Sequence, residues 1–326
     1  MKRREFITLL GGAAVAWPLA ARAQQIVPIL GFLHQGSPDQ FEYLTAGFRK
    51  GLKQSGYVDG ENLLIEYRWA EGHYDRLAEL ASDLVRRKVS VIVSVYALAG
   101  FAAKDATSTI PIVFLTGADP VRERLVSALN RPGANVTGVT YFGVLLGAKR
   151  LSLLHDLLPR ATRFALLINP SNRVATENYV EGTEEAANKL GLQIVIVSAS
   201  SEREIDERFA TIAEQRIDAL IFAPDAFLVS RQHQIVSLAA RHAIPTMYSE
   251  PEAVLAGGLV SYGADVGSAY REVGLYAARI LKGEKPSDLP VVQSTKFQLV
   301  LNLKTAKALG LTIPQDVLSI ADEVIE

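Results

Sequence analysis

The sequence predicts an α/β fold made of two similar, doubly wound lobes of parallel sheet joined by a multi-strand hinge. Short aliphatic or β-branched runs alternate with longer amphipathic segments, which is the pattern of successive βαβ units. The second half of the chain repeats the plan of the first at a spacing of about 125 to 135 residues. A chain of 326 residues also suits two domains better than one hydrophobic core.

The N-terminal segment predicts export. Arg3 and Arg4 precede an apolar stretch at 8–21, and Ala21-Arg22-Ala23 then has the small-x-small pattern of a cleavage site. This is the order of parts in a twin-arginine signal peptide, and the apolar stretch is too short to span a bilayer stably. We expect residues 1–23 to be removed by cleavage after Ala23 and the mature protein to be periplasmic.

Strands are expected at short buried runs, namely 28–33, 63–67, 89–94, 112–115, 164–168, 193–197, 219–222, 246–248 and 259–262. Helices are expected between them. The segment 74–87 places leucines and alanine on one face with charges opposite, as in a helix that covers a sheet. The segment 175–190 is followed by Gly191, a residue that commonly ends helices.

Four pairs of segments carry the internal repeat. In chain order, 29–35 is similar to 165–170, 91–96 to 219–225, 110–116 to 244–249, and 136–140 to 259–263, and the third pair shares an Ile-Pro start. A duplicated unit predicts two lobes of the same topology. We expect the first lobe at 26–140 plus about 264–290, and the second at 141–263 plus about 291–326.

Polar residues at the strand ends predict the ligand site. In open parallel sheets, ligands bind outside the carboxyl ends of the strands, where helix N-termini also point. The expected ligand-binding residues are Gln35, Ser37, Tyr96, Thr116, Gly117, Asp119, Tyr141, Asn169, Asp225, Tyr248, Ser249, Glu250, Tyr262 and Asp265. If the two strand-end edges face each other, these residues line a cleft between the lobes. Tyr141 and Tyr262 are also expected at hinge crossings.

Several of these residues also suit purely structural roles. Asp119 precedes Pro120, as an N-cap precedes a proline in the first turn, and this capping role is the favoured one. Ser37 and Ser249 have capping-box spacing and are expected to cap helices. Each strand-end tyrosine is equally suited to packing a lobe edge.

The strand-end tyrosines favour a flat or aromatic ligand. Few lysines or arginines lie at these ends, so a small zwitterion or carboxylate is a better fit than a sugar phosphate. Helix N-termini would bind its carboxylate, and Asp225, Glu250 or Asp265 would bind an amino group.

The chain resembles the ABC transporter substrate-binding proteins of the type I periplasmic binding protein fold, in the branch with tryptophan- and tyrosine-type receptors. The residues that carry the resemblance are RREFI at 3–7, GYVDGEN at 56–62, EYRWA at 66–70, FLTGADPV at 114–121, RPGANVTGV at 131–139 and GAKR at 147–150. The resemblance implies a monomeric receptor with three hinge crossings that holds a small molecule between its lobes and delivers it to an ABC permease in the inner membrane.

Other classes of protein fit the sequence less well. The chain has no cysteine, its five histidines lack ligand spacing, and the phosphate-loop, dinucleotide, nucleophile-elbow and HExxH motifs are missing, so we expect neither an enzyme nor a metal or other cofactor. A doubly wound hydrolase remains an alternative, because a catalytic triad is defined by its geometry and not by the order of its residues in the sequence. Charges nearly cancel, with 34 basic and 35 acidic residues, so the chain lacks the excess of positive charge that is typical of nucleic-acid-binding proteins. A periplasmic sensor that presents its ligand to a membrane receptor is the main alternative to an importer component.

Overall fold

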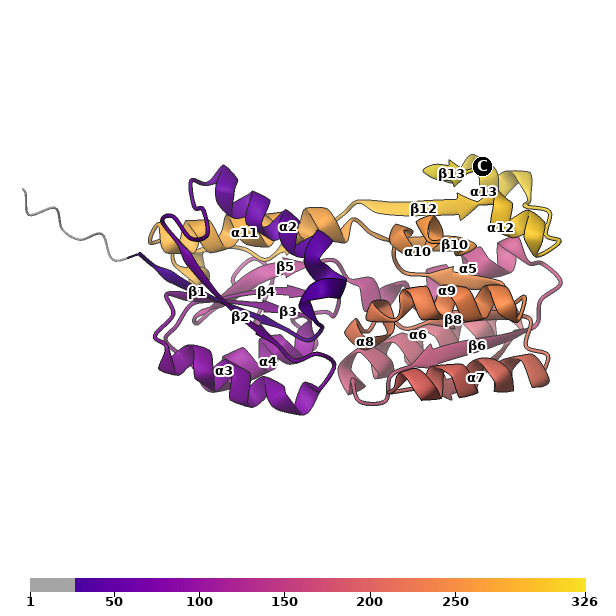
Figure 1. Cartoon of the computed structure of the whole chain (residues 1–326), viewed down its shortest axis with the longest axis horizontal. Helices are drawn as coiled ribbons and strands as arrows, with labels where there is room; N and C mark the ends of the chain where they lie inside the picture. Colours follow the sequence, from indigo (N-terminus) through magenta and orange to yellow (C-terminus); the bar gives the residue numbers. More distant parts are fainter. Residues whose placement is uncertain (1–26) are drawn as a thin grey trace, which may run out of the picture.

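The computed structural model describes residues 27–326, which form two α/β lobes lying side by side (Figure 1). The first sheet contains β1 (Ile29–His34), β2 (Leu64–Trp69), β3 (Val91–Val95), β4 (Ile112–Thr116), β5 (Val136–Thr140) and β11 (Val292–Gln293), in the order β11-β5-β4-β3-β1-β2. All its strand pairs are parallel. Its helices are α2 (Pro38–Gln54), α3 (Leu77–Arg86), α4 (Ala97–Ala106) and α11 (Val266–Leu281), with the 3-10 turns η1 (Tyr74–Arg76) and η3 (Pro286–Asp288).

The second sheet contains β6 (Arg163–Ile168), β7 (Gln193–Ser198), β8 (Ala219–Phe222), β9 (Thr246–Tyr248), β10 (Val260–Ala264), β12 (Phe297–Asn302) and β13 (Glu323–Ile325), in the order β13-β12-β10-β9-β8-β6-β7. Only β12 runs antiparallel to its neighbour β10. The helical elements of this part are η2 (Gly143–Leu146), α5 (Gly147–Leu157), α6 (Arg173–Leu190), α7 (Glu202–Glu214), α8 (Ala226–Ser230), α9 (Gln232–Arg241), α10 (Pro251–Leu255), α12 (Leu303–Ala308) and α13 (Gln315–Ser319).

The two lobes share one topology. The order β5-β4-β3-β1-β2 in the first sheet matches β10-β9-β8-β6-β7 in the second, strand for strand along the chain. The four repeated segments contain four of these five strand pairs, all except β2 and β7. The predicted fold class, two similar doubly wound lobes of mainly parallel sheet, is therefore confirmed.

Both faces of each sheet are buried, because side chains alternate along every strand and helices cover both sides. In β6, Phe164 and Leu166 pack under α5 and α6, whereas Ala165 and Leu167 belong to the core under α7 and α9. Strands of this kind have almost no polar interior positions. Polar side chains therefore gather where the strands end.

The chain passes between the lobes three times. It leaves the first sheet after β5, returns after β10 to form α11, and leaves again after β11 to form β12, the long yellow strand at the top of Figure 1. Val292 and Gln293 of β11 pair with Val139 and Thr140, so the start of the 291–326 segment lies on the first sheet.

All nine predicted strands are present with small shifts at their ends. The structure also has β5, which is the repeated segment 136–140 left out of the strand list, and it adds β11, β12 and β13, which were not predicted. It divides the predicted helix 74–87 into η1 and α3. The signal peptide and its cleavage site lie outside the described residues. Within 27–326 no helix is long and apolar enough to cross a membrane.

Two glycines allow α2 and α11 to pack in direct contact. A Cβ atom on Gly274 would lie 2.3 Å from the carbonyl oxygen of Phe48, and one on Gly51 would lie 2.1 Å from that of Arg271. Both distances are far below van der Waals contact. Only a residue without a side chain fits at either position.

Gly274→Ala is therefore expected to lower the free energy of unfolding by about 1–3 kcal/mol, because the helices must separate. Gly182→Ala is the matched control, since Gly182 lies within α6 and a Cβ there meets no atom within 4 Å. This change should raise the stability by about 0.5–1 kcal/mol through helix propensity. Chemical denaturation of both variants measures the difference, and equal stability of the two would contradict the packing described.

Candidate functional site

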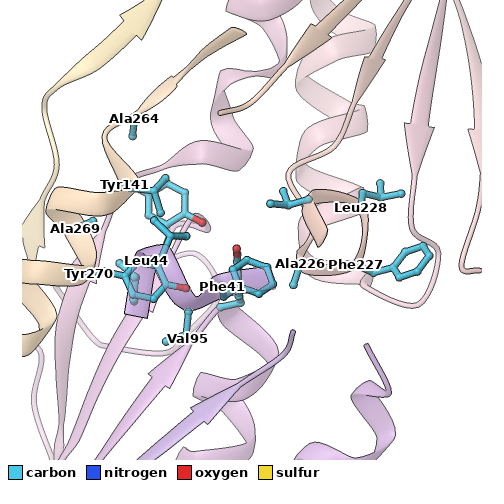
Figure 2. Packing of buried hydrophobic residues seen from close by; sticks show 14 of the residues in the cluster. Phe41, Leu44, Val95, Tyr141, Ala226, Phe227, Leu228, Ala264, Ala269 and Tyr270 are labelled. Carbon is cyan, nitrogen blue, oxygen red and sulfur yellow. The ribbon is translucent and has the colours of Figure 1, made fainter. Parts of the chain in front are cut away.

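A small enclosed cavity lies between the lobes at the carboxyl ends of the strands. It has a volume of about 10 Å³, room for about one water molecule. Its lining comes from both lobes and from the crossings between them: Tyr96, Tyr141, Gly143, Arg150, Pro224, Val229, Ser249, Glu250, Ala264 and Val266. In this conformation the lobes are closed on each other. Figure 2 shows the hydroxyl groups of Tyr141 and Tyr270 directed toward the second-lobe segment that carries Ala226 and Leu228.

Tyr96 and Tyr141 form the aromatic side of this cavity. Tyr96 precedes α4 with a φ of 71°, a backbone conformation that is uncommon for a residue with a side chain. Its buried hydroxyl has no hydrogen-bond partner within residues 27–326. The Tyr141 ring lies where a Cβ on Gly117 or Gly143 would be 2.8 or 2.7 Å from it, so these glycines make room for the ring. Gly117 thus acts on the site through Tyr141.

Glu250 brings a buried carboxyl group to the cavity from the second lobe. It is the N-cap residue of α10 and is 7% exposed. Its Oε2 accepts a hydrogen bond of 3.0 Å from the Tyr43 hydroxyl of α2, across the lobes. Burial, with a smaller contribution from the charge of Glu252, raises the pKa of Glu250 to about 7, although Tyr43 and Arg150 act in the opposite direction. The neighbouring Ser249 has a buried hydroxyl that is unpartnered within 27–326.

Arg150 places a buried guanidinium at the same cavity. This residue of α5 is 1% exposed, and its Nε donates to the carbonyl oxygen of Tyr262 at 2.7 Å. Its Nη1 lies 3.2 Å from the Tyr179 hydroxyl. Arg150 belongs to the GAKR segment that carries the family resemblance, but it was not among the predicted site residues. Site residues were predicted only at strand ends, and Arg150 was missed because it lies within a helix.

Asp225, in contrast, is fully engaged in structural hydrogen bonds. Its carboxylate accepts from the side chains of Asn169, Asn172 and Tyr74 and from the backbone N–H groups of Phe227 and Leu228. Tyr74 belongs to the first lobe, so its 2.8 Å bond to Asp225 joins the lobes. Because a carboxylate has about four lone-pair positions, no acceptor capacity remains for a ligand.

The other predicted residues do not line the cavity. Gln35 is fully buried, and both polar atoms of its side chain are unpartnered in the described part of the chain. Thr116 accepts from the N–H of Ala118. Tyr248 packs edge-on against Phe222 in the second-lobe core. Tyr262 stacks on Phe297.

The predicted helix caps need correction in two places. Ser37 occupies the N-cap position of α2, but its hydroxyl donates to Gln40 and caps no backbone group. Ser249 is not the cap of α10, because Glu250 holds that position. Asp119 does accept from the N–H groups of Val121 and Arg122, at the start of a turn. Asp265 is half-buried at the start of α11 and accepts from the N–H of Ser268.

His34, the one histidine at a strand end near the cleft, has a structural role. Its Nδ1 accepts from the N–H of Gly36, and its Nε2 lies 2.8 Å from the Tyr270 hydroxyl. Burial lowers the pKa of His34 to about 3, so the ring stays neutral at physiological pH. In residues 27–326 no group of three or more His, Cys, Asp or Glu side chains is placed to hold a metal ion.

A larger hollow of about 680 Å³ lies on α6 and the edge strand β7, but it is open to solvent. Its rim carries Glu177, Glu181, Glu184 and Glu185, which are all exposed and hence hydrated. The interlobe cavity instead gathers buried polar groups that have lost contact with water. It is therefore the better candidate for a ligand site.

Two lobes of identical topology, three crossings and a buried polar cavity at the facing strand ends define a type I periplasmic binding protein. The model of the ABC transporter substrate binding protein family matches residues 31–325, and the chain belongs to this family. It is thus a substrate-binding protein for a small molecule, of the kind that works with an ABC permease on the outer side of the cytoplasmic membrane.

Among related proteins, a tyrosine-binding protein of Clostridioides difficile is 29% identical over 265 residues, which cover 81% of this chain and 76% of the relative. An ABC domain in complex with L-Trp from Streptococcus pneumoniae is 28% identical with a TM-score of 0.80, covering 91% of this chain and 100% of that structure. A conserved domain protein from Vibrio cholerae is 27% identical with a TM-score of 0.84, covering 91% and 99%. These relatives match between 81% and 91% of the chain.

One further structure shows which conformation the lobes adopt here. A substrate-binding protein with adhesive properties from Clostridium difficile, in its ligand-free, open form, is 27% identical and covers 92% of this chain and 99% of that structure, but its TM-score is only 0.63. The L-Trp complex has almost the same identity and coverage with a TM-score of 0.80. The lobe arrangement is therefore more similar to the ligand-bound relative than to the open one.

Proposed function

We propose that this protein is the periplasmic receptor of an ABC importer for an aromatic α-amino acid, exported by the twin-arginine route and active as a monomer. One observation carries the proposal: the interlobe cavity combines the rings of Tyr96 and Tyr141 with buried hydroxyl groups that lack partners in the described residues. Buried polar groups without partners are costly in a folded protein, so a ligand that bonds to them is favoured. The L-Trp and tyrosine named for the two relatives support an aromatic ligand.

Binding requires the lobes to open and to close again on the ligand. The cavity of about 10 Å³ is too small for an amino acid, so the ligand occupies space that the facing lobe surfaces fill in this conformation. A ligand stabilises closure because it contacts both lobes only in the closed state. The bonds from Tyr43 to Glu250 and from Tyr74 to Asp225 contribute to the same closed arrangement.

Calorimetric titration of the mature protein tests this function. Any co-purified ligand is removed by partial unfolding and dialysis, and the protein is titrated with L-tryptophan, L-tyrosine and L-phenylalanine, with L-leucine and D-galactose as controls. At least one aromatic amino acid is expected to bind with a dissociation constant of about 1 μM or tighter, and about 100-fold more tightly than L-leucine. Binding to galactose alone would exclude the proposed ligand class.

A further inference from the structure

The interlobe cavity is lined by two opposite charges that do not pair with each other. Arg150 and Glu250 are the charged residues of its lining, and they are 1% and 7% exposed. Among the described residues no acidic group lies within 4.0 Å of the Arg150 guanidinium. Buried charges are usually paired, because each loses its hydration. Two such charges held apart at one cavity therefore point to a third, charged partner between them.

Each of these two groups has one polar atom that makes no hydrogen bond to the described residues. Arg150 uses Nε and Nη1 for bonds to protein oxygens, whereas its Nη2 makes no hydrogen bond within 27–326. Glu250 accepts the Tyr43 hydroxyl at Oε2, and its Oε1 accepts no hydrogen bond from the described residues. The bonds to the carbonyl of Tyr262 and to Tyr43 also fix both groups in place. The site therefore holds both charged groups in place and leaves Nη2 of Arg150 and Oε1 of Glu250 available for a ligand.

We propose that Arg150 and Glu250 are the specificity-determining pair for a free α-amino acid: the guanidinium binds the α-carboxylate and the Glu250 carboxylate binds the α-ammonium group. The inference rests on the proposed function and deepens it, since it names the two ligand groups that are recognised. Charge-assisted hydrogen bonds of this kind are the strongest available to a small polar ligand.

The other acidic residues predicted to bind an amino group are unsuited to it. All acceptor positions of Asp225 are occupied by five donors of the protein. Asp265 is half-buried, and its two oxygens accept from the N–H and hydroxyl of Ser268. Neither residue lines the cavity. Glu250 is the remaining acid of the three.

Ligand analogues test the pair without altering the protein. For whichever amino acid binds tightest, the panel adds the decarboxylated amine, the α-amide and the deaminated acid; for tryptophan these are tryptamine, tryptophan amide and indole-3-propionate. Loss of either charged group should weaken binding about 100-fold or more, because one buried charge is then left unpaired. Equal binding of the amino acid and either analogue would overturn the proposal.

Two variants that each remove one charge assign the ligand groups to the residues. Glu250→Gln should weaken amino acid binding about 10- to 100-fold and leave the affinity for the deaminated acid unchanged or higher. Glu252→Gln is the matched control, because Glu252 is half-buried two residues away and does not line the cavity. Arg150→Gln should bind the amino acid and its amide equally. If Arg150→Gln does not fold, the ligand analogues still test whether both charged groups of the ligand are recognised, since they are measured with the unaltered protein.

The outcomes separate this inference from the proposed function. If a non-aromatic amino acid such as L-leucine binds best but requires both charged groups, the pair is supported and the aromatic ligand is wrong. If aromatic amino acids bind but Glu250→Gln behaves like Glu252→Gln, the function is supported and the pair is overturned. Absence of binding by every amino acid overturns both.

Discussion

Asp225→Ala is expected to lower the free energy of unfolding by about 3–5 kcal/mol, the largest effect of any change near the cleft. Asp225 is 1% exposed and accepts five hydrogen bonds, from three side chains and two backbone N–H groups at the start of α8. Alanine removes the acceptor of the Asn169, Asn172 and Tyr74 side chains and of the Leu228 N–H in a buried environment, whereas the Phe227 N–H keeps the Tyr74 hydroxyl as an acceptor at 3.1 Å. Urea denaturation followed by circular dichroism measures the loss.

Tyr74→Phe is the control for this effect. It removes the two hydrogen bonds that the Tyr74 hydroxyl makes with the second lobe, to Asp225 and from the Phe227 N–H, but leaves the contacts of Asp225 with Asn169 and Asn172 intact. The free energy of unfolding should fall by only about 1 kcal/mol, while the closed conformation becomes less favourable. If Asp225→Ala is as stable as Tyr74→Phe, the carboxylate does not organise the second lobe as described.

The stability of the ligand-free protein is expected to fall as the pH rises from 5 to 8 because of Glu250. Burial raises the pKa of this carboxyl from its ordinary value of 4.5 to about 7 in the closed structure. The closed fold therefore favours the protonated form, and this stabilisation, complete below pH 4.5, is lost as the pH rises through 7. The loss is at most about 3 kcal/mol, the full value applying if the lobes stay closed.

The groups around Glu250 agree with a pKa above the ordinary value. Its neighbours are the hydroxyl groups of Tyr43, Tyr96, Tyr141 and Tyr270 from the first lobe and the hinge, with Glu252 on its own helix and Arg150 on α5. Only Arg150 among them is a cation. A ligand ammonium group adds the missing positive charge and should flatten the pH dependence.

Thermal unfolding of the ligand-free protein between pH 5 and 8 measures this effect. Glu250→Gln should lose most of the slope, whereas Glu61→Gln, a change in the exposed segment before β2, should keep it. Parallel pH profiles for the wild type and Glu250→Gln would show that the carboxyl is hydrated in solution and that the lobes are open.

The fold was predictable because its signals are local and repeated. Buried parallel strands such as 91–95 and 219–222 are short apolar runs, and the repeat along the chain corresponds to the repeated strand order of the two sheets. The three unpredicted strands depend on tertiary pairing. β11 has two residues and exists through its bonds to β5, and β12 is defined by its antiparallel pairing with β10.

The site was predictable in its location more than in its residues. The strand-end rule led to Tyr96, Tyr141, Ser249 and Glu250, which the structure brings to one cavity. The same rule cannot tell which way a strand-end side chain points, and Tyr248 turns into the core. It also cannot find Arg150, which reaches the cavity from within α5 and is held there by a carbonyl oxygen 112 positions along the chain.

A crystal structure of the complex with the tightest-binding amino acid tests the central claim most directly. We predict a ligand enclosed between the two lobes, with its α-carboxylate on Arg150, its α-ammonium group on Glu250 and its side chain against Tyr96 and Tyr141. A ligand bound with both charged groups away from these two residues, or bound in the hollow beside α6, would contradict the account.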